Sequence, residues 1–259
     1  MMSRNYLLVP IRVLALVIWV VSMPLVFMLC SLFRVPRHTE LPHVFHAGMR
    51  AIFGIRVQKL GNATETQPAL YVSNHISYLD VIVLGGLKAF FIAKSEVANW
   101  PVFGQLARFQ NTLFFERSAG KARHQLNAMQ NHLKLGKRLT LFPEGTSTNG
   151  THVVPFKSSL FEAANLGDDY PRVAIQPITI AYTHHNDLAM NQAQRDHYAW
   201  YATMPFGAHF AKLFSLKKVD VKVVFHPVCY LDEFESRKEC AEHCYKLVAD
   251  TLDELMAAA

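Results

Sequence analysis

A histidine and an aspartate five residues apart, His75 and Asp80, are the first pair in this sequence with side chains suited to catalysis. Histidine exchanges protons near neutral pH, so His75 is a natural general base. A carboxylate bonded to one ring nitrogen fixes the tautomer that leaves the other nitrogen free to accept a proton. The pair is thus the orienting half of a Ser-His-Asp triad. The serine is missing, because Ser77 is too near in sequence and no Gly-x-Ser-x-Gly motif occurs.

The spacing of this pair constrains where each residue lies. On one continuous α-helix, residues five apart point about 140° away from each other, so the two side chains could hardly meet. An apolar run at 69–72 predicts a strand before His75, and a second apolar run at 81–84 follows Asp80. We therefore predict His75 in a turn after the strand and Asp80 in the first turns of the next helix. Strand ends of this kind open onto a crevice in α/β proteins.

The remaining sequence alternates between strand and helix patterns. Strands are predicted at 52–60, 69–73, 90–93, 112–115, 138–142, 173–180 and 219–225. Helices are predicted at 80–85, at 96–108 with Ser95 as N-cap and a break at Pro101, and at 119–135, 157–166 and 232–256. The segment 184–218 has no clear assignment, and His184-His185 is interpreted as a loop feature. The alternation predicts an α/β fold with a largely parallel mixed sheet flanked by helices.

The N-terminal segment predicts attachment to a membrane. Residues 13–33 are 21 residues without a charge, and about 20 suffice to cross a bilayer as a helix. We therefore assign residues 1–40 to a membrane anchor and residues 41–259 to the catalytic domain. Two arrangements stay open: a spanning helix, or a re-entrant hairpin broken at Met23-Pro24 with both basic flanks on the cytoplasmic face. A cleaved signal peptide does not fit, since the apolar run is too long.

The charge distribution points to lipid as the partner of this segment. The net charge of +6 lies entirely in residues 1–60, which hold seven basic groups and one acidic group. Basic groups beside an apolar stretch suit an anionic membrane surface. A nucleic-acid binder would spread them over its folded domain instead. We expect membrane lipids as partners, on the cytoplasmic face, and no nucleic acid.

The four cysteines, Cys30, Cys229, Cys240 and Cys244, are too few and too scattered for a disulfide scaffold, which favours a reducing compartment. Cys240 and Cys244 flank His243. No second ligand cluster accompanies them in the sequence, so no metal site is expected.

A second motif, Phe142-Pro143-Glu144-Gly145-Thr146, follows the strand predicted at 138–142. Alone, these residue types would suit a plain strand-end turn. Here they follow Asn74-His75-x4-Asp80 and Phe115-Glu116-Arg117-Ser118, and Val154-Pro155-Phe156-Lys157-Ser158 comes next. In this order the motifs resemble those of the glycerophospholipid acyltransferases, in particular the 1-acylglycerol-3-phosphate acyltransferases. The resemblance covers about residues 50–185.

The resemblance implies direct acyl transfer, in which His75 deprotonates a substrate hydroxyl that attacks an acyl thioester. It assigns Lys94 to the oxyanion that this attack creates. It also implies that Arg117 binds the acceptor's phosphate, which suits a planar fork of donors. Glu144 would then orient Arg117 or a glycerol hydroxyl.

Four further residues are substrate-binding candidates. Gly145 lets the backbone come close to a ligand, and Thr146 can donate a hydrogen bond to it. Lys157 can add charge to the phosphate site. Asn74 either helps to bind substrate or positions the His75 turn.

The expected reaction moves a fatty acyl group from acyl-CoA or acyl carrier protein to 1-acylglycerol 3-phosphate, giving phosphatidic acid, with no metal or bound organic cofactor. The segment 199–204 is similar to one in acyltransferases that make ornithine lipids, which usually carry Gly-Asp in place of Ala202-Thr203. A lyso-ornithine lipid or another lysophospholipid is therefore an alternative acceptor. The alternative of another class is a non-catalytic membrane lipid-binding protein, which the presence of His75, Asp80, Arg117 and Glu144 argues against.

Overall fold

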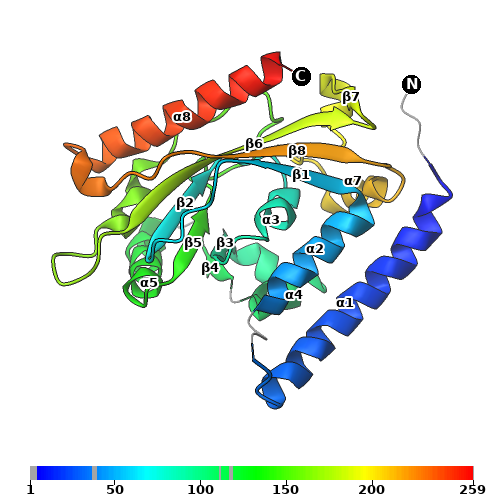
Figure 1. Cartoon of the computed structure of the whole chain (residues 1–259), viewed down its shortest axis with the longest axis horizontal. Helices are drawn as coiled ribbons and strands as arrows, with labels where there is room; N and C mark the ends of the chain where they lie inside the picture. The colour runs from blue at the N-terminus through cyan, green and yellow to red at the C-terminus, as the bar shows by residue number, and fades with distance from the viewer. Residues whose placement is uncertain (1–4, 37–39, 111, 117–118, 259) are drawn as a thin grey trace.

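The computed structural model describes residues 5–36, 40–110, 112–116 and 119–258. Its strands are β1 (Ile55–Leu60), β2 (Ala69–Ser73), β3 (Phe90–Lys94), β4 (Leu113–Phe115), β5 (Arg138–Leu141), β6 (Ala174–His185), β7 (Leu188–Ala189) and β8 (Val219–Phe225). They form one eight-stranded sheet in the order β1-β8-β6-β2-β5-β3-β4, with β7 paired to β6 (Figure 1). The predicted mixed, largely parallel sheet is confirmed: β6 pairs antiparallel with β7 and β8, and the other neighbours are parallel.

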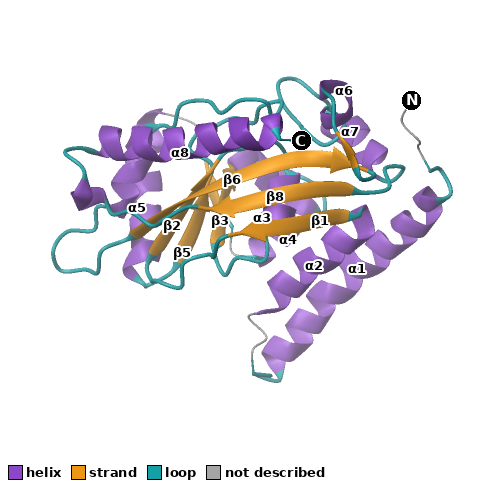
Figure 2. Ribbon diagram, turned by 45° about the horizontal axis from the view of Figure 1, so that its top comes forward, coloured by secondary structure: helices purple, strands orange, loops and turns teal. Residues whose placement is uncertain are grey.

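Helices cover both faces of this sheet (Figure 2). The α-helices are α1 (Leu8–Leu32), α2 (Leu41–Phe53), α3 (Leu79–Leu84), α4 (Phe103–Phe109), α5 (Ala122–Lys134), α6 (Gln192–Arg195), α7 (Phe206–Leu213) and α8 (Arg237–Ala257). Short 3-10 helices lie at Ser95–Asn99, Ala119–Lys121, Ser158–Ala164 and Leu231–Glu233. One core packs α2, α3 and α7 against the sheet, and a second packs α5, α8 and Ser158–Ala164 against the other face. Strand β2 is buried along its whole length, as a parallel strand between two helical layers should be.

Helix α1 is unbroken through Pro24, so of the two arrangements left open, the hairpin broken at Met23-Pro24 is not the one observed. A proline inside a helix removes one backbone hydrogen bond, which a long apolar helix tolerates. The chain turns back only after Leu32, and α2 then returns along α1 (Figures 1 and 2). The indole nitrogen of Trp19 donates to the carbonyl of Phe45, 3.0 Å away, and ties the two helices together.

Within the described part of the chain, α1 is the one helix long and apolar enough to cross a membrane. None of its most apolar 18-residue window is buried. One side packs on the first core through Val9, Leu16, Trp19, Val20 and Met23. Most of the other residues are large, apolar and exposed: Ile11, Leu14, Ile18, Val21, Leu25, Met28, Leu29 and Leu32. Such a surface is stable against lipid and unfavourable in water.

Several element boundaries differ from the prediction. Ile52 and Phe53 end helix α2 instead of starting a strand, and Gly54, in the left-handed conformation with φ of 66°, closes that helix. The helix predicted at 157–166 is a 3-10 helix at Ser158–Ala164. Lys94, not Ser95, occupies the N-cap position of Ser95–Asn99.

The unassigned segment 184–218 is ordered. Strand β6 extends to His185, so His184-His185 belongs to a strand and not to a loop. Helices α6 and α7 follow, and α7 contributes Leu213 to the first core.

Hydrogen bonds from Arg12 hold α1 against the rest of the molecule. Its side chain is buried, and its guanidinium donates to the carbonyls of Leu213 (3.1 Å), Phe214 (3.5 Å) and Lys217 (2.8 Å), and also to that of Leu216. The last carbonyls of a helix have no partner within the helix and carry partial negative charge. Arg12 therefore caps the end of α7 from a helix about 200 residues earlier in the chain.

Replacing Arg12 by methionine should lower the free energy of unfolding by about 1–3 kcal/mol, because the buried carbonyls lose their donor. Chemical denaturation of the detergent-purified protein measures this. Arg34→Met, at an exposed position just after α1, is the matched control and should leave stability unchanged. Equal stability of the two variants would show that Arg12 does not hold α1 in place.

Candidate active site

His75 lies at the edge of the sheet where four neighbouring parallel strands end. It sits in the loop between β2 and α3, and Asp80 is the second residue of α3. The structure confirms the predicted placement of His75 in a turn and Asp80 in the first helical turn. The carboxyl ends of β3, β4 and β5 lie at the same edge, because all three run parallel to β2 (Figure 1).

Asp80 is fully buried and accepts four hydrogen bonds. Its Oδ2 accepts from Nδ1 of His75 at 2.8 Å and from the backbone N–H groups of Ile76 (2.7 Å) and Ser77 (2.9 Å). Its Oδ1 accepts from the hydroxyl of Tyr182, 2.9 Å away on β6. A buried carboxylate is stable only when its oxygens are satisfied in this way.

These contacts decide the protonation of His75. An oxygen that accepts from two backbone N–H groups can only accept from the ring as well, so Nδ1 carries the ring proton. The imidazole stacks on Phe142 at the start of the second motif, with ring centroids 4.2 Å apart. None of the described residues hydrogen-bonds to Nε2, and the side chain is 22% exposed. His75 therefore presents a basic nitrogen to a molecule arriving from outside.

Glu144 holds the same loop from the other side. Its side chain is 2% exposed, and its oxygens accept from the backbone N–H groups of His75 (2.6 Å) and Val154 (2.7 Å). Each oxygen of Glu144 thus accepts from one backbone N–H, and the side chain joins the loop after β5 to the loop after β2. The role predicted for Glu144, to orient Arg117 or a glycerol hydroxyl, stays a prediction.

The environment of Glu144 shifts its proton affinity. Burial raises the pKa of Glu144 to about 8, an effect that outweighs the amide hydrogen bonds from Val154 and His75, which favour the ionised form. The charge of Asp80 raises this pKa further. Burial thus makes the protonated form of Glu144 more favourable than it is for a glutamate in water.

Asn74 is buried, and its amide is occupied by the protein. Its Nδ2 donates to the carbonyl of Ile180 (2.9 Å), and its Oδ1 accepts from the N–H of Ile180 (2.8 Å). The backbone pairing of β2 with β6 ends at Ser73, and the Asn74 side chain adds one more rung. Of the two roles predicted for Asn74, the structure favours positioning of the His75 turn over contact with substrate.

Gly145 and Lys157 lie in contact, as two parts of one predicted binding region should. A Cβ on Gly145 would meet Nζ of Lys157 at 2.2 Å, and Gly145 has a φ of 70° that glycine tolerates best. The backbone N–H of Lys157 also donates to the carbonyl of Pro143 (3.0 Å). Lys157 and Thr146 are exposed, so their predicted roles in binding substrate stay predictions.

Lys94 ends β3 at the same sheet edge and is exposed. Neighbouring strands are about 4.8 Å apart, and only β5 separates β3 from β2, so Lys94 and His75 can face one substrate molecule. Arg117, the predicted phosphate ligand, lies outside the described residues. It follows Phe115, the last residue of β4, by two positions.

Some of the groups that support His75 carry no recognisable pattern in the sequence. Tyr182, in the middle of the apolar β6, is indistinguishable from a core residue until the fold brings it to Asp80. The backbone N–H of Trp200 donates to the carbonyl of Ile76 (2.9 Å), so segment 199–204 lies against the His75 loop. Phe142 belongs to the second motif. Its stacking on His75 arises only in the fold, where β5 and β2 are neighbouring strands.

The raised pKa of Glu144 predicts a pH-dependent stability. Its ordinary pKa is 4.5, so the stabilisation from binding a proton is complete below about pH 4.5 and is lost as the pH rises through about 8. Between these values the parent should lose about 1.4 kcal/mol of unfolding free energy per pH unit relative to Glu144→Gln, which cannot titrate. Denaturation across pH 5–8 measures the difference.

Glu96→Gln, at an exposed position, is the control and should follow the parent. Parallel pH profiles for the parent and Glu144→Gln would contradict the raised pKa.

Comparison with known proteins places this geometry in a family. A family model described as Acyltransferase matches residues 54–181. The lyso-ornithine lipid O-acyltransferase of Brucella abortus is 38% identical over 207 residues, 78% of each chain. That of Rhodobacter capsulatus is 37% identical over 75% of this chain and 69% of its own. The 1-acyl-sn-glycerol-3-phosphate acyltransferase of Neisseria gonorrhoeae is 28% identical over 71% of each.

A solved structure shows the same fold. The 1-acyl-sn-glycerophosphate (LPA) acyltransferase PlsC from Thermotoga maritima aligns over 98% of this chain and 96% of its own, with a TM-score of 0.70 and 20% identity. With 38% identity to one relative across most of both chains, and with the family model spanning the His75 and Glu144 loops, this chain belongs to the PlsC-type acyltransferase family.

Proposed function

We propose that this acyltransferase moves a fatty acyl group from an acyl thioester to the free hydroxyl of a lyso-ornithine lipid. The observation that carries the choice of acceptor is the 38% and 37% identity to two lyso-ornithine lipid O-acyltransferases, against 28% to a 1-acyl-sn-glycerol-3-phosphate acyltransferase. The sequence-based expectation of a phosphate acceptor becomes the second candidate. It rests on Arg117 and on the Neisseria relative.

The reaction follows from the state of His75. Nε2 accepts the proton of the acceptor hydroxyl as its oxygen attacks the thioester carbonyl carbon, and Asp80 stabilises the imidazolium that forms. The tetrahedral intermediate collapses with cleavage of the carbon–sulfur bond. The leaving thiolate takes the proton from His75, which returns the base to its starting state. One carbon–oxygen bond forms, one carbon–sulfur bond breaks, and no covalent enzyme intermediate is needed.

The intermediate carries an oxyanion that requires donors. We assign this role to Lys94, because it ends a strand two places from β2 at the same sheet edge. The acyl donor, acyl-CoA or acyl carrier protein, is a co-substrate, and the proposal involves no resident metal or organic cofactor.

The segment expected to distinguish the acceptor classes is fixed to the catalytic loop. Besides the Trp200 amide bond to Ile76, the hydroxyl of Ser147 donates to the carbonyl of Trp200 (2.5 Å). Ala202 has a φ of 54°, the left-handed conformation that suits the glycine of the ornithine-lipid enzymes. This conformation supports a similar path for the segment here, despite the missing Gly-Asp pair.

The exposed apolar side of α1 supports membrane attachment, which both acceptors require because both are lipids. We propose that the His75 edge of the sheet works at the cytoplasmic face, where acyl-CoA and acyl carrier protein are found. The basic residues flanking α1 agree with this orientation.

Detergent-purified protein offered both acceptors with the same acyl-CoA tests the proposal. We expect kcat/KM for the lyso-ornithine lipid to exceed that for 1-acylglycerol 3-phosphate by about tenfold or more. His75→Ala should lower acyl transfer by about 10²–10⁴-fold, because the base is removed. His124→Ala, at an exposed position on α5, is the control and should keep full activity. Preference for 1-acylglycerol 3-phosphate would restore the second candidate, and activity on neither would refute both.

Ala202 provides an independent test of the segment conformation. A non-glycine residue at positive φ is strained, so Ala202→Gly should raise the free energy of unfolding by up to about 1 kcal/mol. Ala208→Gly, exposed on helix α7, should instead lower it by about 1 kcal/mol. Equal losses in both variants would show that Ala202 is not strained.

A further inference from the structure

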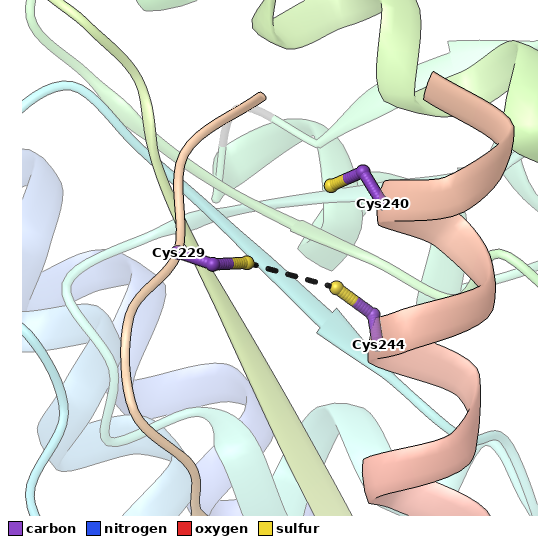
Figure 3. Close-up of side chains that lie close together, drawn as sticks. All are labelled: Cys229, Cys240 and Cys244. Atoms are coloured by element: carbon purple, nitrogen blue, oxygen red, sulfur yellow. Dashed lines mark hydrogen bonds between the residues drawn. The ribbon is translucent and has the colours of Figure 1, made fainter. Parts of the chain in front are cut away.

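Three of the four cysteines meet in the second core, on the face of the sheet opposite α2 and α3. Cys240 and Cys244 lie four residues apart on α8, so they share one face of that helix. Cys229 comes from the segment after β8, and all three are buried (Figure 3). The sulfur atoms of the three residues lie within 4.8 Å of one another, and those of Cys229 and Cys244 are 3.9 Å apart.

The sequence analysis expects no metal site, although Cys240 and Cys244 lie beside His243, and the structure adds a third cysteine to this pair. His243 is exposed on α8 and packs against Phe234. The third sulfur belongs to Cys229, which lies 11 residues before Cys240 and is held by two backbone hydrogen bonds to Ile175 of β6, each 2.9 Å long. A helix and a strand-bound segment therefore bring the three side chains together.

We propose that Cys229, Cys240 and Cys244 form a structural site for one thiophilic d10 cation, Zn²⁺ or Cu⁺. Metal–sulfur bonds of about 2.3 Å in a three-thiolate site place the sulfurs about 4 Å apart. The observed separations require shifts of less than about 1 Å to reach that geometry. Thiolate ligands select these soft cations over Mg²⁺ or Ca²⁺.

The number of ligands agrees with this class of ion. Within the described residues, no His, Asp or Glu joins the three cysteines as a further ligand. Cu⁺ can use the three sulfurs alone, and Zn²⁺ completes its coordination with one added oxygen ligand.

The charge of the site is partly compensated by its position. Binding releases the three thiol protons to solvent, so the complex carries −1 with Zn²⁺ and −2 with Cu⁺. Cys240 lies at the first turn of the 21-residue helix α8, where the N-terminal end of the helix dipole favours negative charge. The bound ion would link the start of α8 to the segment after β8. Both of these parts of the chain contribute cysteines to the second core.

Metal binding to the full-length protein in detergent tests the site. Reduced, metal-stripped protein is equilibrated separately with Zn²⁺ and with Cu⁺, and bound metal is counted by mass spectrometry after gel filtration. We expect one ion per chain in the parent and in Cys30→Ser, the matched control in α1. Cys229→Ala should lower the affinity by at least about tenfold. Its acyl-transfer activity, expected to be retained because the His75 loop packs through Ile76 on the other core, shows that the variant folds.

X-ray absorption of the loaded parent protein gives a second readout that needs no variant. Three sulfur neighbours with Cu⁺, or three sulfurs and one oxygen with Zn²⁺, would support the site. Two outcomes would overturn it: metal uptake no greater than in Cys229→Ala, or a shell of nitrogen and oxygen alone. The parent purified without reductant could instead show a disulfide in a thiol count and take up no metal. That result would replace the metal site with a pair of redox-active cysteines.

Discussion

The hydrogen bonding of the buried Asp80 carboxylate is the interaction on which the arrangement of the His75 loop depends. It accepts from His75, from two backbone N–H groups of the same loop and from Tyr182 across the sheet. A carboxylate taken out of water is stable only with this degree of pairing. The loop therefore has one favourable shape, and in that shape the imidazole has its Nδ1 proton bound and its Nε2 available. The basicity of the site and the fold of the loop are set by the same atoms.

Glu144 extends this constraint to the neighbouring strand. It joins the N–H of His75 to that of Val154, so the loops after β2 and β5 cannot move independently. Phe142, between β5 and Glu144, also stacks on the imidazole. The proposed general base is consequently in position before any substrate arrives, which would lower the entropy lost on reaching the transition state. Burial, together with the smaller effect of the nearby Asp80 charge, raises the pKa of Glu144.

The sequence predicted what depends on local pattern. The strand at 69–73 is an apolar run, the strand at 219–225 alternates buried and partly exposed residues, and the spacing of His75 and Asp80 excluded a single helix. What it missed depends on contacts between distant segments. The apolar end of α2 has the composition of a strand, but Phe53 there packs on Phe210 and Phe214, which come from much later in the chain. The backbone partners of Asn74 on β6 and of Glu144 in the His75 loop lie far away in sequence, so these hydrogen bonds become visible only in the fold.

The same constraint explains how one catalytic loop can serve different acceptors. His75, Asp80 and Glu144 are satisfied by protein groups, so the acceptor need contribute nothing to their arrangement beyond its hydroxyl. Recognition of the headgroup then falls to residues around the loop, and segment 199–204 is bonded to it through Ile76 and Ser147. In the proposed reaction, we expect a change in that segment to alter which lipid fits without disturbing the base. A change that breaks the Trp200 bond to Ile76 would instead reach His75 directly, because Ile76 is its neighbour and its N–H is bound to Asp80.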